Sequence, residues 1–221
     1  MKVVKAITEL RFSGTLKLLK PFEELYVAIT GEEPKDKLQP TPALGLQVKE
    51  KRLRIGVEAK RCWVDLEEIP NPGYCVQIIT SIFKKIDDLI GIPLLARVGV
   101  RSMRIEPSEE EFRELVARYK RIMLGTSELF ERAVDLGVVL NLTDDDRKVT
   151  LITGPMELTQ LKRDFLLFEP VGLPNTFIFA DMDYATTSET KYSPKFLSDF
   201  ITRGLSYAEE QSEKVLSTLR S

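Results

Sequence analysis

The C-terminal segment carries one apolar stripe at helical spacing, and this stripe constrains the fold of the 221-residue chain more than any other feature. Ser193-Pro194 is typical of a helix start, because serine caps the first turn and proline fits its first position. The apolar residues on one face of the stripe are Leu197, Phe200, Ile201, Leu205, Ala208, Val215 and Leu219. At about 1.5 Å per residue, such a helix is about 40 Å long. A helix of this length can cross a whole sheet, and its apolar stripe needs a surface of that extent to pack against.

Alternating segments earlier in the chain predict the strands of that sheet. From Val3 to Phe12 the charged residues all fall on one side of an alternating pattern, which is typical of a strand with one buried face. Its buried face takes Val4, Ala6, Thr8, Leu10 and Phe12, and its polar face takes Lys5, Glu9 and Arg11. Further alternation predicts hairpins over 44–57 and 134–153, the second with a tight aspartate turn, and strands over 95–105 and 176–186. The apolar phase slips near Lys60-Arg61, which indicates a bulge or a second turn.

Helical patterns separate these strands. Helices are predicted after Pro21, after Asn71-Pro72 and after a capping box at Ser108–Glu111, with a short one near Leu129-Phe130. Residues 31–42 form a surface connection, and residues 155–175 are compatible with a further short helix. We therefore predict an α+β protein: a mainly antiparallel sheet with helices packed on one face and the long C-terminal helix crossing it. Residues 1–107 form a β-α-β-β-(β)-α-β half and residues 108–221 a second α+β half, and the two can form one continuous domain.

Three short motifs occur in order along most of the chain. They are E-x-R-F at Glu9–Phe12, R-V-G-V-R at Arg97–Arg101, and D-x-D-Y at Asp181–Tyr184 before the long helix. Together they resemble the first, central and late strands of a sporadically distributed family of uncharacterised prokaryotic proteins. The resemblance implies a fold of antiparallel strands and helices. It implies no chemistry, because that family has no established activity.

The complete absence of histidine excludes several classes of enzyme. Ser-His-Asp and Cys-His nucleophile systems, histidine metal sites and the usual near-neutral general base all require it. The two cysteines, Cys62 and Cys75, are too few for a four-coordinate zinc site, and their spacing is not that of a redox pair. We predict that they are small buried residues. No glycine motif for nucleotides or esterases occurs. We therefore expect a non-enzymatic protein without a cofactor.

The charges are almost balanced, with 32 Lys+Arg against 34 Asp+Glu. A net charge of −2 provides no field that would attract nucleic acid or an anionic membrane, so neither is an expected partner. No apolar run approaches the roughly 20 residues that span a bilayer. Charged residues also interrupt the N-terminal apolar positions, unlike a signal peptide. These features predict a cytoplasmic location.

Two arginines on the predicted strand 95–105 are the first candidate ligand-binding residues. Arg97 and Arg101 share one face, and guanidinium groups suit carboxylate or phosphate ligands. We add Glu9 and Arg11, on the polar face of the first strand, to this candidate site, with Arg101 as its centre. The alternative is that the arginines form cross-strand ion pairs with acids such as Glu9 or Glu58. Trp63 either lines a pocket or fills the core.

Asp181 and Asp183 are the candidate metal ligands. Two residues apart on a strand, they lie on the same face, where paired carboxylates can hold a hard cation or share a proton. Glu9 could join them if the two strands are neighbours. The alternative is an ordinary solvated strand face.

Three functional hypotheses follow. The first is an uncharacterised cytoplasmic binding or assembly protein that self-associates through an exposed sheet edge or the terminal helix. The second is a small-ligand-binding protein whose pocket lies between the sheet and the C-terminal helix, where Arg97 or Arg101 orients an acidic group of the ligand. The third is a metal-dependent hydrolase that uses Asp181 and Asp183.

Overall fold

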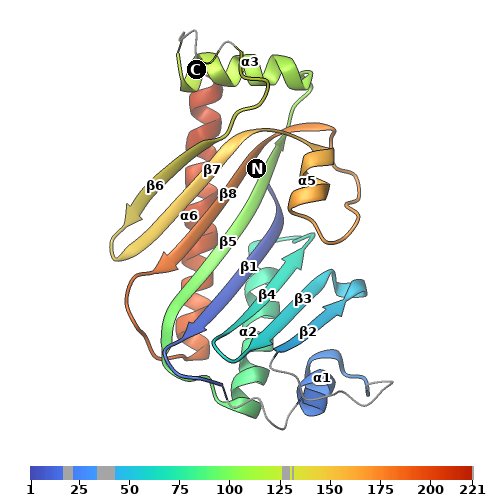
Figure 1. Cartoon of the computed structure of the whole chain (residues 1–221), viewed down its shortest axis with the longest axis vertical. Coiled ribbons are helices and arrows are strands. Elements are labelled where there is room, and N and C mark those ends of the chain that lie inside the picture. Colours follow the sequence, from blue (N-terminus) through green and yellow to red (C-terminus); the bar gives the residue numbers. More distant parts are fainter. Residues whose placement is uncertain (17–21, 34–42, 126–129, 131, 221) are drawn as a thin grey trace.

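A computed structural model describes residues 1–16, 22–33, 43–125, 130 and 132–220. These residues form one eight-stranded sheet in the order β2-β3-β4-β1-β5-β8-β7-β6, with every neighbouring pair antiparallel (Figure 1). The strands are β1 (Lys2–Phe12), β2 (Ala43–Val48), β3 (Leu53–Glu58), β4 (Arg61–Glu67), β5 (Leu95–Pro107), β6 (Val138–Asp144), β7 (Arg147–Glu157) and β8 (Thr176–Thr186). The predicted helix start at Pro21, most of the connection 31–42 and most of the short helix near Leu129 lie outside the described residues.

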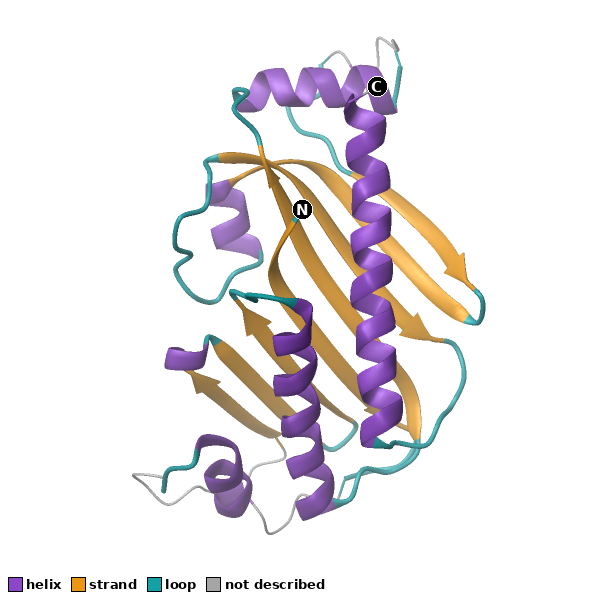
Figure 2. Ribbon diagram, turned by 180° about the vertical axis from the view of Figure 1, so that it is seen from behind, coloured by secondary structure: helices purple, strands orange, loops and turns teal. Residues whose placement is uncertain are grey.

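The helices alternate with these strands, and the long ones cover one face of the sheet. They are α1 (Phe22–Thr30), α2 (Pro72–Ile90), α3 (Phe112–Met123), α5 (Leu158–Asp164) and α6 (Pro194–Arg220). A short 3-10 turn, Lys49–Lys51, joins β2 to β3. Helices α2 and α6 lie side by side against the same face (Figure 2). The predicted α+β architecture with its long C-terminal helix is confirmed.

Helix α6 is fixed to the sheet along its apolar stripe. It begins where predicted, because the Ser193 hydroxyl accepts a hydrogen bond from the Phe196 amide at 3.1 Å. Midway along it, Gly204 allows close approach, since a Cβ atom there would lie 3.3 Å from the side chains of Val100 and Tyr184. The helix therefore covers the centre of the sheet, including strands from both halves of the chain. The two halves share one sheet, joined where β5 pairs with β8.

The first strand follows its predicted alternation with one exception. The register between β1 and β5 shifts between Val3 and Lys5, so Val4 is a bulged residue. Its side chain packs with Met103 and Ile105 in a smaller cluster on the opposite face of the sheet. The prediction that Val4 shares a face with Ala6 is therefore wrong, because alternation cannot reveal an inserted residue.

The structure decides two predictions about local elements, the phase slip near Lys60 and the capping box at Ser108. The phase slip near Lys60 is a turn between β3 and β4, not a bulge. The predicted capping box at Ser108 is wrong: α3 begins at Phe112, and Glu111 occupies the N-cap position without a side-chain cap. The Ser108 amide instead donates to the carbonyl oxygen of Thr176 at 3.0 Å, which keeps this residue in the extended sheet connection.

Both cysteines are buried and free, as predicted. Among the described helices, none combines the length and apolar character needed to cross a bilayer.

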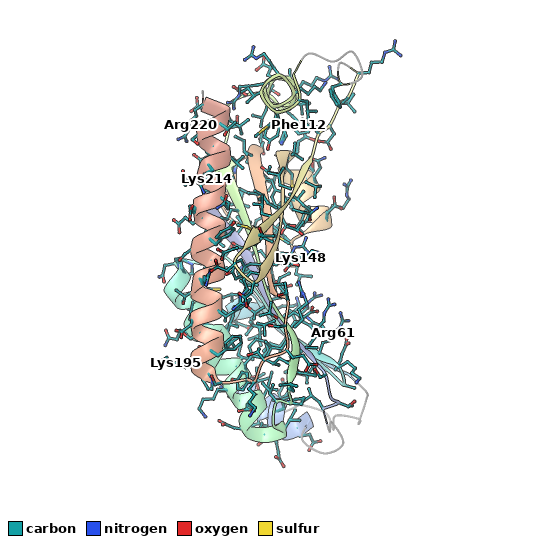
Figure 3. The ribbon with its side chains drawn as sticks, turned by 90° about the vertical axis from the view of Figure 1, so that its left-hand side faces the viewer. Arg61, Phe112, Lys148, Lys195, Lys214 and Arg220 are labelled. Atoms are coloured by element: carbon teal, nitrogen blue, oxygen red, sulfur yellow. The ribbon has the colours of Figure 1, made fainter. Side chains whose placement is uncertain are left out.

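Among the described residues, α5 and the segment that follows it cover one end of the face opposite α2 and α6. There the smaller cluster contains Val4, Met103, Ile105, Leu161, Phe177 and Phe179. We call this side of the sheet the open face. Figure 3 shows Arg61 and Lys148 on this side, directed away from α6.

Candidate functional site

The open face brings together all six residues selected from the sequence, which are Glu9, Arg11, Arg97, Arg101, Asp181 and Asp183. The strand register explains why. Arg101 on β5 lies directly between Ile7 on β1 and Asp183 on β8. Since directly opposed residues of antiparallel strands share a face, the odd-numbered residues of these strands lie together.

A hollow of about 380 Å³ occupies the centre of this face, and we call it the arginine hollow. Its lining consists of Ile7, Glu9, Arg11, Arg54, Arg61, Trp63, Arg97, Gly99, Arg101 and Asp183. Five of these ten residues are arginines, and two are acids. Arg54 and Arg61 were missed from the sequence, because Arg61 lies beside β1 only through the pairing of β4 with β1, and Arg54 lies one strand further away, on β3.

Glu9 lies among three arginines. Its Oε1 accepts a hydrogen bond from Arg11 Nε at 2.6 Å and one from Arg97 Nη1 at 3.4 Å. Arg61 Nη1 lies 3.7 Å from its Oε2, although Arg61 pairs more closely with Glu58, at 2.8 Å through Nε. The predicted pair of Arg97 with Glu9 is therefore present, whereas Glu58 pairs with Arg61 and not with Arg97.

Each predicted metal ligand is held by an arginine. Arg101 donates to both carboxylate oxygens of buried Asp181, with distances of 2.5–3.1 Å. This hydrogen bonding raises the pKa of Arg101, which therefore remains charged. Arg97 Nη2 binds Asp183 Oδ2 at 2.6 Å. Glu9 does not adjoin the aspartates directly, because β5 lies between β1 and β8 and Arg97 bridges the gap.

The described residues do not supply a ligand set for the proposed metal. Within this part of the chain, no group of three or more Asp, Glu or Cys side chains is placed to hold an ion. Asp181 and Asp183 instead neutralise arginines. Their arrangement is that of charge partners in a cross-strand network.

Two glycines shape the floor of the arginine hollow. A Cβ atom on Gly56 would lie 2.0 Å from the ring of Trp63, so the indole lies over this strand position. A Cβ atom on Gly99 would lie 2.7 Å from Arg97 Nη1, so that guanidinium lies across β5 in the same way. Because both positions lack side chains, an aromatic ring and a cation can lie close over the backbone of the sheet.

A second hollow, of about 540 Å³, adjoins the first at Arg101, and we call it the apolar hollow. Its apolar side chains are Leu136, Ile152, Pro155, Met156, Phe165 and Phe179. The rings of Phe165 and Phe179 are in contact, with their centroids 4.9 Å apart. Asp181, whose carboxylate binds Arg101, also lines this hollow.

A buried charged cluster closes the end of the open face beside α5. Lys5 Nζ lies 3.0 Å from Asp65 Oδ2 and 3.2 Å from Glu67 Oε1. It also donates to the carbonyl oxygen of Phe165 at 2.8 Å, and Glu67 accepts the Leu167 amide at 2.7 Å. Burial raises the pKa of Asp65, although Lys5 opposes this shift. The cluster therefore fastens the segment after α5 onto the sheet.

Comparisons with known proteins assign no family to this chain. No protein-family model matches it, and no curated protein matches it. The resemblance to the uncharacterised prokaryotic family therefore remains a prediction.

The second hypothesis predicts a pocket under the C-terminal helix with Arg97 or Arg101 in it, and the structure places these arginines on the other face of the sheet. Arg97 and Arg101 lie on the open face, whereas α6 covers the opposite face, so neither arginine can orient a ligand beneath that helix. Under α6, the ring of Tyr184 contacts those of Phe200 and Tyr207, with centroids 5.4 and 5.7 Å apart. The ligand-binding candidates instead surround the arginine hollow.

Proposed function

We propose that this protein is a non-enzymatic binding protein whose arginine hollow holds a small ligand by a phosphate or carboxylate group. One observation carries this proposal: Glu9 is shared by the guanidinium groups of Arg11, Arg61 and Arg97. Arg61 also binds Glu58 and Arg97 also binds Asp183, but three carboxylates offer about twelve lone pairs, fewer than the roughly fifteen N–H donors of three guanidiniums. A further anion in the hollow would accept the remaining hydrogen bonds.

The hydrogen-bond donors of the hollow, and not an excess of positive charge, support the same ligand class. Its lining has five arginines and two carboxylates, and Glu58, Asp65 and Asp181 pair with three of these arginines from outside the lining, so five positive charges face five negative ones. Arg54 Nε is buried without a hydrogen-bond partner. Guanidinium binds carboxylate and phosphate through two parallel hydrogen bonds, which favours planar or tetrahedral oxyanions over halide ions.

The protein provides its own reporter for a binding experiment. Trp63 is the sole tryptophan of the chain and lines the hollow. Titration with inorganic phosphate, pyrophosphate and citrate should therefore change the tryptophan fluorescence in a saturable manner. Raising the salt concentration should weaken binding, because screening acts on partly exposed charges.

Matched charge variants test whether the arginines are responsible. Arg97→Gln and Arg11→Gln should each weaken binding by about fivefold, which corresponds to about 1 kcal/mol for a partly exposed charged hydrogen bond. Lys195→Gln removes the same charge from exposed Lys195 in the first turn of α6, far from the hollow, and should leave the affinity unchanged (Figure 3). The proposal fails if none of the three anions gives saturation, or if the Arg97 and Lys195 variants bind equally well.

A specific observation also favours self-assembly as a second function. Strand β6 is one edge of the sheet and has no charged residue from Val138 to Thr143. Val139 and Leu140 on this edge are 58% and 40% exposed. Unprotected apolar edge strands pair readily with another chain. We propose that two copies pair through β6.

Light scattering over a wide concentration range tests the assembly. A dimer is expected, and Val139→Lys should convert it to a monomer, because a lysine on an edge strand opposes pairing. Gln47→Lys places the same charge on β2, the other edge, and should not change the mass. A monomer at every concentration would remove this second function.

A further inference from the structure

We infer that the ligand of the arginine hollow is an amphiphilic anion, with a phosphate or carboxylate head in that hollow and a short apolar chain in the adjoining apolar hollow. This inference rests on the proposed anion binding and specifies the remainder of the ligand. It concerns an anion that is free in solution, not a lipid within a membrane.

The two hollows share one lining side chain. Arg101 lines both, and its partner Asp181 lines the apolar hollow. The guanidinium of Arg101 is held on Asp181 by its Nε and Nη2 atoms. An oxyanion bound on the Arg101 side of the arginine hollow therefore adjoins the second hollow, and a substituent on it can extend over β8 and β7.

The second hollow differs in chemistry from the rest of the open face. Ile152 is 38% exposed on β7, beside Met156 and the contacting pair of Phe165 and Phe179. Elsewhere on this face, the side chains around the arginine hollow are mainly charged. Apolar surface beside a few convergent polar groups is typical of a small-molecule site.

Where α5 and the segment before β6 line the apolar hollow, two polar side chains are hydrogen-bonded to each other. Gln160 of α5 donates through Nε2 to Asp135 Oδ2 at 3.0 Å, and both residues line the hollow. This hydrogen bond links α5 to the segment before β6. The apolar lining therefore ends at a polar border, which favours a short chain over a long one.

Calorimetric titration with ethyl, butyl and octyl phosphate tests the inference without any variant. Burying one methylene group strengthens binding by a factor of about four. With at least two more methylenes buried, octyl phosphate should bind at least about tenfold more tightly than ethyl phosphate. Equal affinities for the three phosphates would overturn the inference while leaving anion binding intact. Failure of all three to bind would instead overturn the proposed function.

Two substitutions test whether the alkyl chain of the ligand lies in the apolar hollow. Ile152→Asn should reduce the ratio of octyl to ethyl affinity to below about threefold, because it places an amide in the apolar hollow. Leu89→Asn changes a similarly exposed leucine, 37% exposed on α2, and should retain the full ratio. A ratio that Ile152→Asn does not reduce would overturn the inference.

A sedimentation assay separates a free anion from a membrane lipid. The protein should not co-sediment with vesicles of phosphatidylcholine that contain one-fifth phosphatidic acid. Vesicle binding without binding of monomeric octyl phosphate would overturn the inference in favour of a membrane surface.

Discussion

The indole of Trp63 lies over Gly56, the residue directly opposite it on β3. Glycine at this position is a steric requirement, since a Cβ atom would lie 2.0 Å from the ring. The pair fixes the position of the only tryptophan on the floor of the arginine hollow. Tryptophan emission, excited selectively over that of the six tyrosines, therefore reports on the candidate site.

Gly56→Ala should displace the indole from the sheet. The added methyl cannot coexist with the ring, so Trp63 should become more exposed and its emission should move to longer wavelength. Overpacking of this kind costs about 1–3 kcal/mol in the free energy of unfolding. Gly45→Ala, the next position across the sheet on β2, is the matched control, because no atom lies within 4 Å of its added Cβ. Identical emission from the two variants would contradict the geometry.

Lys5→Met should be strongly destabilising. It leaves Asp65 and Glu67 buried without their shared cation, and breaking a buried pair in this way costs about 3–5 kcal/mol. Urea denaturation measures the loss. Lys148→Met, at an exposed lysine of β7, should change stability by less than about 0.5 kcal/mol. A small effect at Lys5 would show that the cluster does not hold the segment after α5.

The loss in Lys5→Met should also depend on pH. The pKa of Asp65 in the folded protein is raised above its ordinary value of 3.8, and removing Lys5 removes an interaction that lowers it. A raised folded-state pKa means that the folded protein binds more protons than the unfolded chain. The contribution of Asp65 to stability is therefore full below about 3.8 and is lost as pH rises through its folded-state value. Lys5→Met should be less destabilising at pH 5 than at pH 8, and the opposite order would contradict this assignment.

Arg101 and Asp181 should be energetically coupled. Arg101→Gln leaves a buried carboxylate without its cation and should cost about 3 kcal/mol, most of which a second change, Asp181→Asn, restores. The same double-mutant cycle on Arg97 and Asp183, whose carboxylate is more exposed than that of Asp181, should give a coupling energy of less than about 1 kcal/mol. Chemical denaturation of both cycles checks the ranking. Equal coupling energies would show that burial of Asp181 has no energetic consequence.

The two cysteines should be inert in the folded protein. Burial raises the pKa of Cys75 to about 12 and that of Cys62 well above its ordinary value, so neither forms the reactive thiolate at pH 8. A disulfide reagent should label no thiol in native buffer and two thiols in guanidinium. Rapid native labelling of either cysteine would contradict its buried position.

The sequence predicts the face of a residue well, because alternation is local. It correctly groups Arg97 with Arg101 and Asp181 with Asp183. Strand order is not local, so the sequence left open whether the strands of Glu9 and the aspartates are neighbours, and the structure places β5 between them.

The rest of the candidate site depends on contacts between distant segments. Arg54 and Arg61 reach the arginine hollow only because β4 pairs with β1. Ser108 does not cap α3, because its amide is bonded to Thr176 and its hydroxyl accepts the Glu110 amide before the helix begins. One signal was available: Gly56 and Gly99 interrupt strand patterns, and glycine within a strand often marks close approach of another group.

Strand β5 pairs with β1, which precedes it in the chain, and with β8, which is made much later. During translation, one edge of this 13-residue strand therefore has no native partner until Thr176–Thr186 emerges. The apolar surface later covered by α6 stays exposed still longer. At about 5–20 residues per second, this interval is on the order of ten seconds. The nascent chain thus carries an aggregation-prone edge through the synthesis of its second half, and we expect chaperones to bind it in that interval.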